Sequence, residues 1–254
     1  MKQALLWRGL SFVTAAVFVI LWQLAANLRL ISPVFLPGPD RAWNALLRGF
    51  NSGDLALKLL GTVEHMAAGW LGASLAGIAL GALIGSSRPM RDYVAPSLEW
   101  LRPLPASAII PVAIALFGLS QGMALFVIAF GAIWPVLLAT IHGFAAVEPR
   151  LFEVARALHL PRPAVIFKIA LPSAGPAILA GMGLSLTVAL ILSVVCEILA
   201  GLDGLGQWLL LSARAFRSAD LFAGVMLLGA LGYLTTAAMA QIEKHLLRWR
   251  RPGQ

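Results

Sequence analysis

The side chains that could carry chemistry are few in this chain, and they are dispersed along it. Its four histidines and its single cysteine, Cys196, form none of the H-E-x-x-H, C-x-x-C or G-x-S-x-G patterns that hold a metal or activate a nucleophile. The phosphate-binding pattern G-x-x-x-x-G-K-[ST] is also missing, because no such glycines precede any of the lysines, which are Lys2, Lys58, Lys168 and Lys244. We therefore expect no catalytic residue, no metal site and no cofactor on this chain.

Glu197 is the acidic residue that lies deepest within an apolar run. A carboxylate at the centre of a bilayer costs about 2.5–3.5 kcal/mol on insertion scales, and less toward the interface. Two interpretations remain open. In the first, Glu197 is a polar group at the external mouth of a transport pathway. In the second, which we favour, its carboxyl has a structural role and is held by backbone amides near residues 201–206 or by an arginine. Glu64, His65 and His142 lie at the ends of apolar segments and are expected at the membrane interface.

The stretch Glu153–Pro172 is amphipathic and basic, unlike the long apolar runs on both sides of it. Pro161 and Pro163 break it in the middle, and its first half places apolar residues on one face of a helical turn. The basic residues are Arg156, Arg162 and Lys168, and the apolar ones are Val154, Ala157, Leu158 and Leu160. A charged segment between two spans lies outside the hydrocarbon, and positive charge favours the cytoplasmic side. We therefore expect a cytoplasmic docking site here.

This stretch resembles a loop of the permease subunits of bacterial ABC importers, which reads E-A-A, three residues, G, nine residues, I, one residue, L-P. Glu153, Ala155, Ile169 and the pair Leu171-Pro172 match at the family spacing, whereas Val154 and His159 replace the second residue and the glycine. Glycine adopts a positive φ most easily, so His159 puts the local turn in question. The resemblance implies that this loop couples the chain to an ATPase. The residues in that role would be Glu153, Val154, Ala155, Arg156, Leu158, His159, Ile169, Leu171 and Pro172.

The composition is that of a polytopic membrane protein. Of the 254 residues, 60% are hydrophobic and 12% are charged, against roughly 25% charged in soluble proteins, and the mean hydropathy is +0.87. Six apolar segments are expected to span the membrane, at about 9–29, 59–85, 103–119, 122–145, 173–200 and 221–242. If both termini are cytoplasmic, thirteen of the nineteen Lys and Arg residues lie on the cytoplasmic side and six lie outside. This distribution follows the positive-inside rule, so we expect cytoplasmic termini. The net charge of +8 thus reflects topology, and no nucleic-acid partner is expected.

The external loop after the first span contains a predicted surface helix. Pro33, Pro37 and Pro39 prevent the first span from continuing into it. Asp40 can then begin a short helix through Phe50 that lies at the membrane interface.

Small residues recur every four positions in two of the segments, a pattern that lets helix backbones approach closely. In the second span they are Gly69, Ala73, Gly77, Gly81 and Gly85, and in the fifth they are Ala177, Gly181, Ser185, Ala189 and Ser193. The lower part of the fifth-span ridge is expected to pack on the second span.

The third apolar segment is short and interrupted by proline. Irregular backbone at membrane depth is tolerated where it is buried in protein or lines a wet cavity, so such segments point to transport pathways, although a kink satisfied by its neighbours is the alternative. From Arg102 to Gly118 the segment resembles that of the taurine, alkanesulfonate and nitrate permeases. The candidate pathway residues are Pro103, Pro105, Ser107, Pro111, Ser193 and Glu197.

The resemblance implies an all-α, type I ABC importer fold in the bacterial inner membrane. It also implies a second permease copy, two cytoplasmic ATPases that hold ATP and magnesium, and an external solute-binding protein. The chain would divide into a peripheral first helix with its loop (1–58), a core (59–245) containing the coupling loop 148–172, and a basic tail (246–254) that binds anionic lipid. The implied substrate is a small anion such as taurine, a sulfonate or nitrate. A heterocyclic or pyrimidine precursor is the alternative substrate, while a stand-alone secondary transporter or a membrane-embedded enzyme would be a different class.

Overall fold

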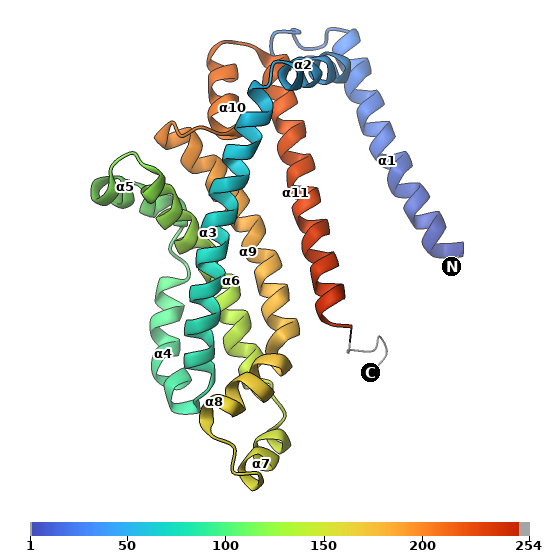
Figure 1. Cartoon of the computed structure of the whole chain (residues 1–254). Helices are drawn as coiled ribbons and strands as arrows, with labels where there is room; N and C mark the ends of the chain where they lie inside the picture. The colour runs from blue at the N-terminus through green and yellow to red at the C-terminus, as the bar shows by residue number, and fades with distance from the viewer. Residues whose placement is uncertain (1, 249–254) are drawn as a thin grey trace.

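The structure is a computed structural model that describes residues 2–248, apart from the side chains of residues 2–9, 11, 12, 95 and 162. Arg250, Arg251 and the rest of the expected basic tail beyond residue 248 lie outside this range. Every regular element within it is helical, as predicted (Figure 1). The elements are α1 (Lys2–Asn27), α2 (Pro39–Asn51), α3 (Asp54–Gly85), α4 (Arg88–Leu101), α5 (Ala106–Phe117), α6 (Gln121–Ala145), α7 (Pro149–Ala157), α8 (Arg162–Val165), a π-helical turn (Ile166–Ala170), α9 (Leu171–Ala200), α10 (Leu205–Arg214) and α11 (Ser218–Leu246).

Four of the described helical segments are long and apolar enough to cross a membrane. They are α3, α6, the continuous stretch Pro163–Ala200 and α11. The pair α4–α5 makes a fifth if the bent pair counts as one span, and the apolar part of α1 covers the shorter stretch Val13–Asn27.

The third apolar segment departs from the single helix expected over 103–119. Its helix, α5, begins only at Ala106 and is preceded by α4, which was not predicted. The two helices meet at an angle of 86°. Pro103 and Pro105 lie at this corner, where their missing N–H groups and fixed φ end one helix and begin the next.

Helix α6 forms the centre of the bundle, with α3 and α9 packed along it. The glycine ridge of α3 faces α6, because a Cβ at Gly77 or Gly85 would lie 3.0 Å from Val136 Cβ or 2.7 Å from Phe144 Cβ. The ridge of α9 faces α6 as well. The lower part of α9 does contact the second span, since Trp70 Nε1 of α3 donates to Met182 O at 3.0 Å, but the small residues of the ridge do not make that contact. Gly181 lies against Pro135 of α6, and Ser185 Oγ donates to Ala132 O at 2.6 Å.

The remaining helices cover the outer part of the bundle. Helix α2 begins at Pro39 and buries Ala42 and Ala45 while its Trp43 stays exposed, which confirms the predicted short helix. Helix α1 leans away from the bundle (Figure 1) and touches it near its C-terminal end, where the Trp22 and Phe222 rings lie 5.4 Å apart. Figure 1 places α2 and α10 at one end of the molecule and α7 and α8 at the other.

Candidate functional site

Helix α7 ends in a hydrogen-bonded turn at His159. The Leu160 N–H donates to Ala155 O and the His159 N–H donates to Arg156 O, both at 3.0 Å, which is the Schellman pattern of helix termination. This pattern needs a left-handed residue after the helix, and His159 takes that position with φ of 50°. The turn that the sequence left in question therefore forms with histidine, at a cost of about 1–2 kcal/mol relative to glycine.

The residues that the sequence predicts to form the coupling loop divide into an inward and an outward set. Ala155 is 1% exposed, and Ile169 and Leu171 pack around the buried Phe144 and Ala174. The outward set, all exposed, comprises Glu153, Val154, Arg156, Leu158, His159 and Pro172. The loop is thus anchored to the ends of α6 and α9 while one side of α7 faces solvent.

A π-helical turn joins this loop to α9. Pro172 has no N–H to donate to the carbonyl four residues earlier, and its ring would clash with that carbonyl. The chain widens there, so that the Leu171 N–H donates to Ile166 O instead. Helix α9 therefore continues from the loop without a break, and Pro163–Ala200 forms one helical segment of 38 residues.

The candidate pathway residues do not form a single cluster. Pro103, Pro105, Ser107 and Pro111 lie exposed along the α4–α5 corner and α5. Ser193 is buried on α9 and donates to Leu190 O at 2.9 Å. The carboxylate of Glu197 forms its polar contacts with α3 and with the start of α10, away from the prolines.

Glu197 is fully buried and hydrogen-bonded. Its Oε2 accepts from the Gly206 N–H at 2.8 Å and from Thr62 Oγ1 at 3.0 Å, and its Oε1 lies 3.2 Å from His65 Nδ1. Thr62 Oγ1 also accepts from the Leu205 N–H at 2.8 Å. A backbone amide from the range 201–206 does contact the carboxyl, and the whole cluster joins α3, α9 and the start of α10.

Thr62 and His65 were not predicted from the sequence as members of this cluster. His65 was expected at the interface, and that expectation is wrong, because it is 6% exposed and paired with Glu197. The available signal was the spacing of Thr62 and His65, which puts both side chains on one face of a helix. Among residues 2–248, no three His, Cys, Asp or Glu side chains gather closely enough to hold a metal ion.

Comparisons with known proteins identify the family of this helical bundle. The chain belongs to the family described as binding-protein-dependent transport system inner membrane component, whose model matches residues 73–248. It is 34% identical over 236 residues to the putative aliphatic sulfonates transport permease protein SsuC of Bacillus subtilis (strain 168), covering 92% of this chain and 85% of that protein. It is 29% identical over 246 residues to the taurine transport system permease protein TauC of Escherichia coli (strain K12), covering 94% and 89%.

Among solved structures, the inward-facing MetNI methionine ABC transporter is similar in fold. The TM-score is 0.68 at 18% sequence identity, over 77% of this chain and 97% of that one. With the family match, this confirms the predicted class: the chain is a permease subunit of an ABC importer, located in the inner membrane. It is a transport subunit.

Proposed function

We propose that α7 is the segment that docks on a cytoplasmic ATPase, and that the chain carries a small anion. The observation that supports docking is the apolar stripe on α7. Leu151, Val154 and Leu158 are 39%, 54% and 65% exposed, and their spacing places them on one face of the helix. An exposed apolar helix face flanked by the charges of Glu153 and Arg156 suits a groove on a partner protein.

The anchoring of α7 explains how docking would move the pathway. Phe152 on α7 packs against a buried cluster that includes Phe144 at the end of α6 and Ala174 at the start of α9. A displacement of the ATPase would therefore be transmitted to two central helices as a rigid-body motion. Such a motion would switch the permease between inward- and outward-open states, with ATP and magnesium held by the ATPase.

The finer architecture belongs to the same proposal. Two copies of this chain, two ATPases and an external solute-binding protein form the importer. Six spans cross the membrane, with α1 as a peripheral first span within unit 1–58, a core at 59–245 and a lipid-binding tail at 246–254. The excess of Lys and Arg on the α7 side of the spans supports cytoplasmic termini.

A basic pocket at the end of the molecule opposite α7 supports an anionic substrate. A pocket of about 390 Å³ between α2 and the α10–α11 turn is lined by Arg41, Arg48 and Arg217, and Asp220 is its only acidic lining residue. Arg217 lies 3.5 Å from Asp220, so the pocket keeps a positive balance. Positive charge at the entrance raises the local concentration of anions. We infer a substrate such as taurine, a sulfonate or nitrate; a heterocyclic precursor is the alternative.

Removing charge from this pocket is expected to weaken uptake of anions. In the double variant Arg41→Gln/Arg48→Gln, the KM for import of the preferred anion by the reconstituted transporter should rise about tenfold at low salt, and less as the ionic strength rises. Arg214→Gln is the matched control, since Arg214 is exposed at the same end but does not line the pocket. An unchanged KM in the double variant, or preferred uptake of an uncharged heterocycle, would contradict the anion assignment.

A further inference from the structure

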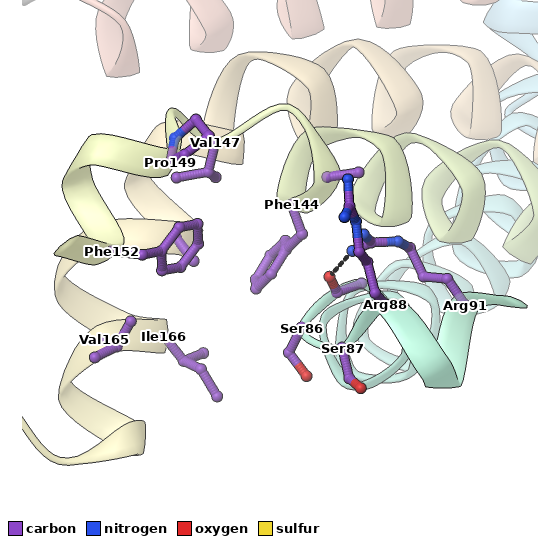
Figure 2. Close-up of a pocket in the computed structure, with 13 residues that line it drawn as sticks. Ser86, Ser87, Arg88, Arg91, Phe144, Val147, Pro149, Phe152, Val165 and Ile166 are labelled. Atoms are coloured by element: carbon purple, nitrogen blue, oxygen red, sulfur yellow. Dashed lines mark hydrogen bonds between the residues drawn. The ribbon is translucent and has the colours of Figure 1, made fainter. Parts of the chain in front are cut away.

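A second pocket, of about 750 Å³, lies at the α7 end of the bundle. It is enclosed by the end of α3, the first turn of α4, the end of α6, the start of α7, and α8 with the π-helical turn. In Figure 2, Phe144 and Phe152 point into the space between α6 and α7, while Arg88 and Arg91 lie on the α4 side of it. The pocket thus combines an apolar wall with a basic one.

The basic wall carries charge that nearby carboxylates do not neutralise. The thirteen lining residues include two arginines and no acidic residue. Arg91 Nη1 donates to Gly85 O at 2.5 Å, which leaves further N–H donors on its guanidinium, and Arg88 is exposed. None of the ion pairs in the described part of the chain involves either arginine. Two neighbouring guanidinium groups of this kind suit a phosphate group.

The apolar wall lies on the side of α7 away from the stripe assigned to the ATPase. At about 100° per residue, Pro149 and Phe152 point to the opposite side of the helix from Val154 and Leu158. A docked ATPase would therefore leave the pocket accessible to a molecule from the membrane. The pocket also lies at the ends of the spanning helices α3 and α6, which the proposed orientation places on the cytoplasmic side of the membrane.

We propose that this pocket binds an anionic phospholipid. The headgroup phosphate contacts Arg88 and Arg91, and the glycerol and first acyl carbons lie against Phe144 and Phe152. Basic pockets between membrane helices on the cytoplasmic side are suited to such headgroups. The assignment to the inner leaflet rests on the proposed orientation. Because Pro149 and Phe152 belong to α7, the bound lipid holds α7 against the turn between α3 and α4.

The test is lipid binding to the full chain, purified in detergent and titrated with phosphatidylglycerol or phosphatidylcholine during native mass spectrometry. We expect one phosphatidylglycerol to be retained in preference to phosphatidylcholine. Each arginine near a headgroup contributes about fivefold in affinity, so Arg88→Gln should weaken binding about fivefold, and Arg88→Gln/Arg91→Gln more strongly. Arg88→Gln alone keeps the contact of Arg91 with Gly85. Arg102→Gln, an exposed position outside the pocket, is the control.

Four results would overturn the proposal. The first is equal binding of the two lipids, and the second is wild-type binding in both pocket variants. The third is displacement of the lipid by millimolar inorganic phosphate, which would identify a site for free anions. The fourth is expulsion of the lipid when the ATPase is added, which would assign the pocket to the ATPase. No transport assay enters the test, so its outcome is separate from that of the proposed function.

Discussion

The Gly81→Leu variant is expected to lose the native packing of α3 on α6, the contact at the centre of the bundle. A Cβ at Gly81 would lie 2.6 Å from Thr140 Cβ and 2.9 Å from Leu137 O. The second neighbour is a backbone atom inside a helix and cannot turn away, and leucine adds three more carbons beyond the Cβ. Overpacking typically costs about 1–3 kcal/mol, and a separation of two central helices exceeds that range. We expect inserted protein that does not elute as a monodisperse peak in detergent.

Gly72→Leu is the matched control for this prediction. Gly72 lies on the same helix, and an added Cβ would meet no atom within 4 Å. Replacing glycine inside a helix removes a propensity cost of about 0.8–1 kcal/mol, so this variant should match or exceed the wild type in thermal stability. The measurement compares the elution profiles and melting temperatures of the two variants with those of the wild type. A monodisperse Gly81→Leu protein with an unchanged melting temperature would show that the ridge does not contact α6.

Glu197→Leu is expected to destabilise the junction of α3, α9 and α10 by about 3–5 kcal/mol, as when one partner of a buried pair is removed. Leucine can accept no hydrogen bond, so the Gly206 N–H, Thr62 Oγ1 and His65 Nδ1 lose their shared partner. Each buried polar group left unpaired costs about 1–3 kcal/mol. Glu197→Gln keeps one acceptor oxygen and the side-chain size, and should lose less.

Thermal unfolding of the purified chain in detergent measures this effect. Glu64→Leu is the control, because Glu64 is an exposed acidic residue on the same turn of α3 as Thr62 and His65. If Glu197→Leu unfolds at the wild-type temperature while transport is lost, Glu197 acts in the pathway and not in the structural junction. Equal losses of stability in Glu197→Leu and Glu197→Gln would instead show that the negative charge is required.

The elements that are specified locally could be predicted from the sequence. Long apolar runs are helical wherever their backbone must satisfy its own hydrogen bonds in lipid, and α3, α6, α9 and α11 follow from that requirement. Pro39 marks the start of α2, and the spacing from Glu153 to Pro172 located the loop that carries α7.

The features that depend on tertiary partners could not be predicted. A ridge of small residues shows that another helix approaches but does not say which one, and both ridges face α6. His65 looked interfacial because its partner, Glu197, lies 132 residues away in the sequence. The corner between α4 and α5 depends on how α5 packs on α6, whereas Pro103 and Pro105 alone allow several angles. His159 in a left-handed turn shows that anchoring of the loop overrides a local preference.

The most direct test of the account is co-purification. The tagged chain would be expressed with its neighbouring open reading frames, and the proteins that elute with it would be identified. We expect an ATPase in stoichiometric amount with the wild type, import that requires ATP, and loss of the ATPase from a Glu153→Lys variant that still inserts in the membrane. A chain that purifies alone and imports its substrate without ATP would contradict the assignment of α7 as the ATPase-docking segment.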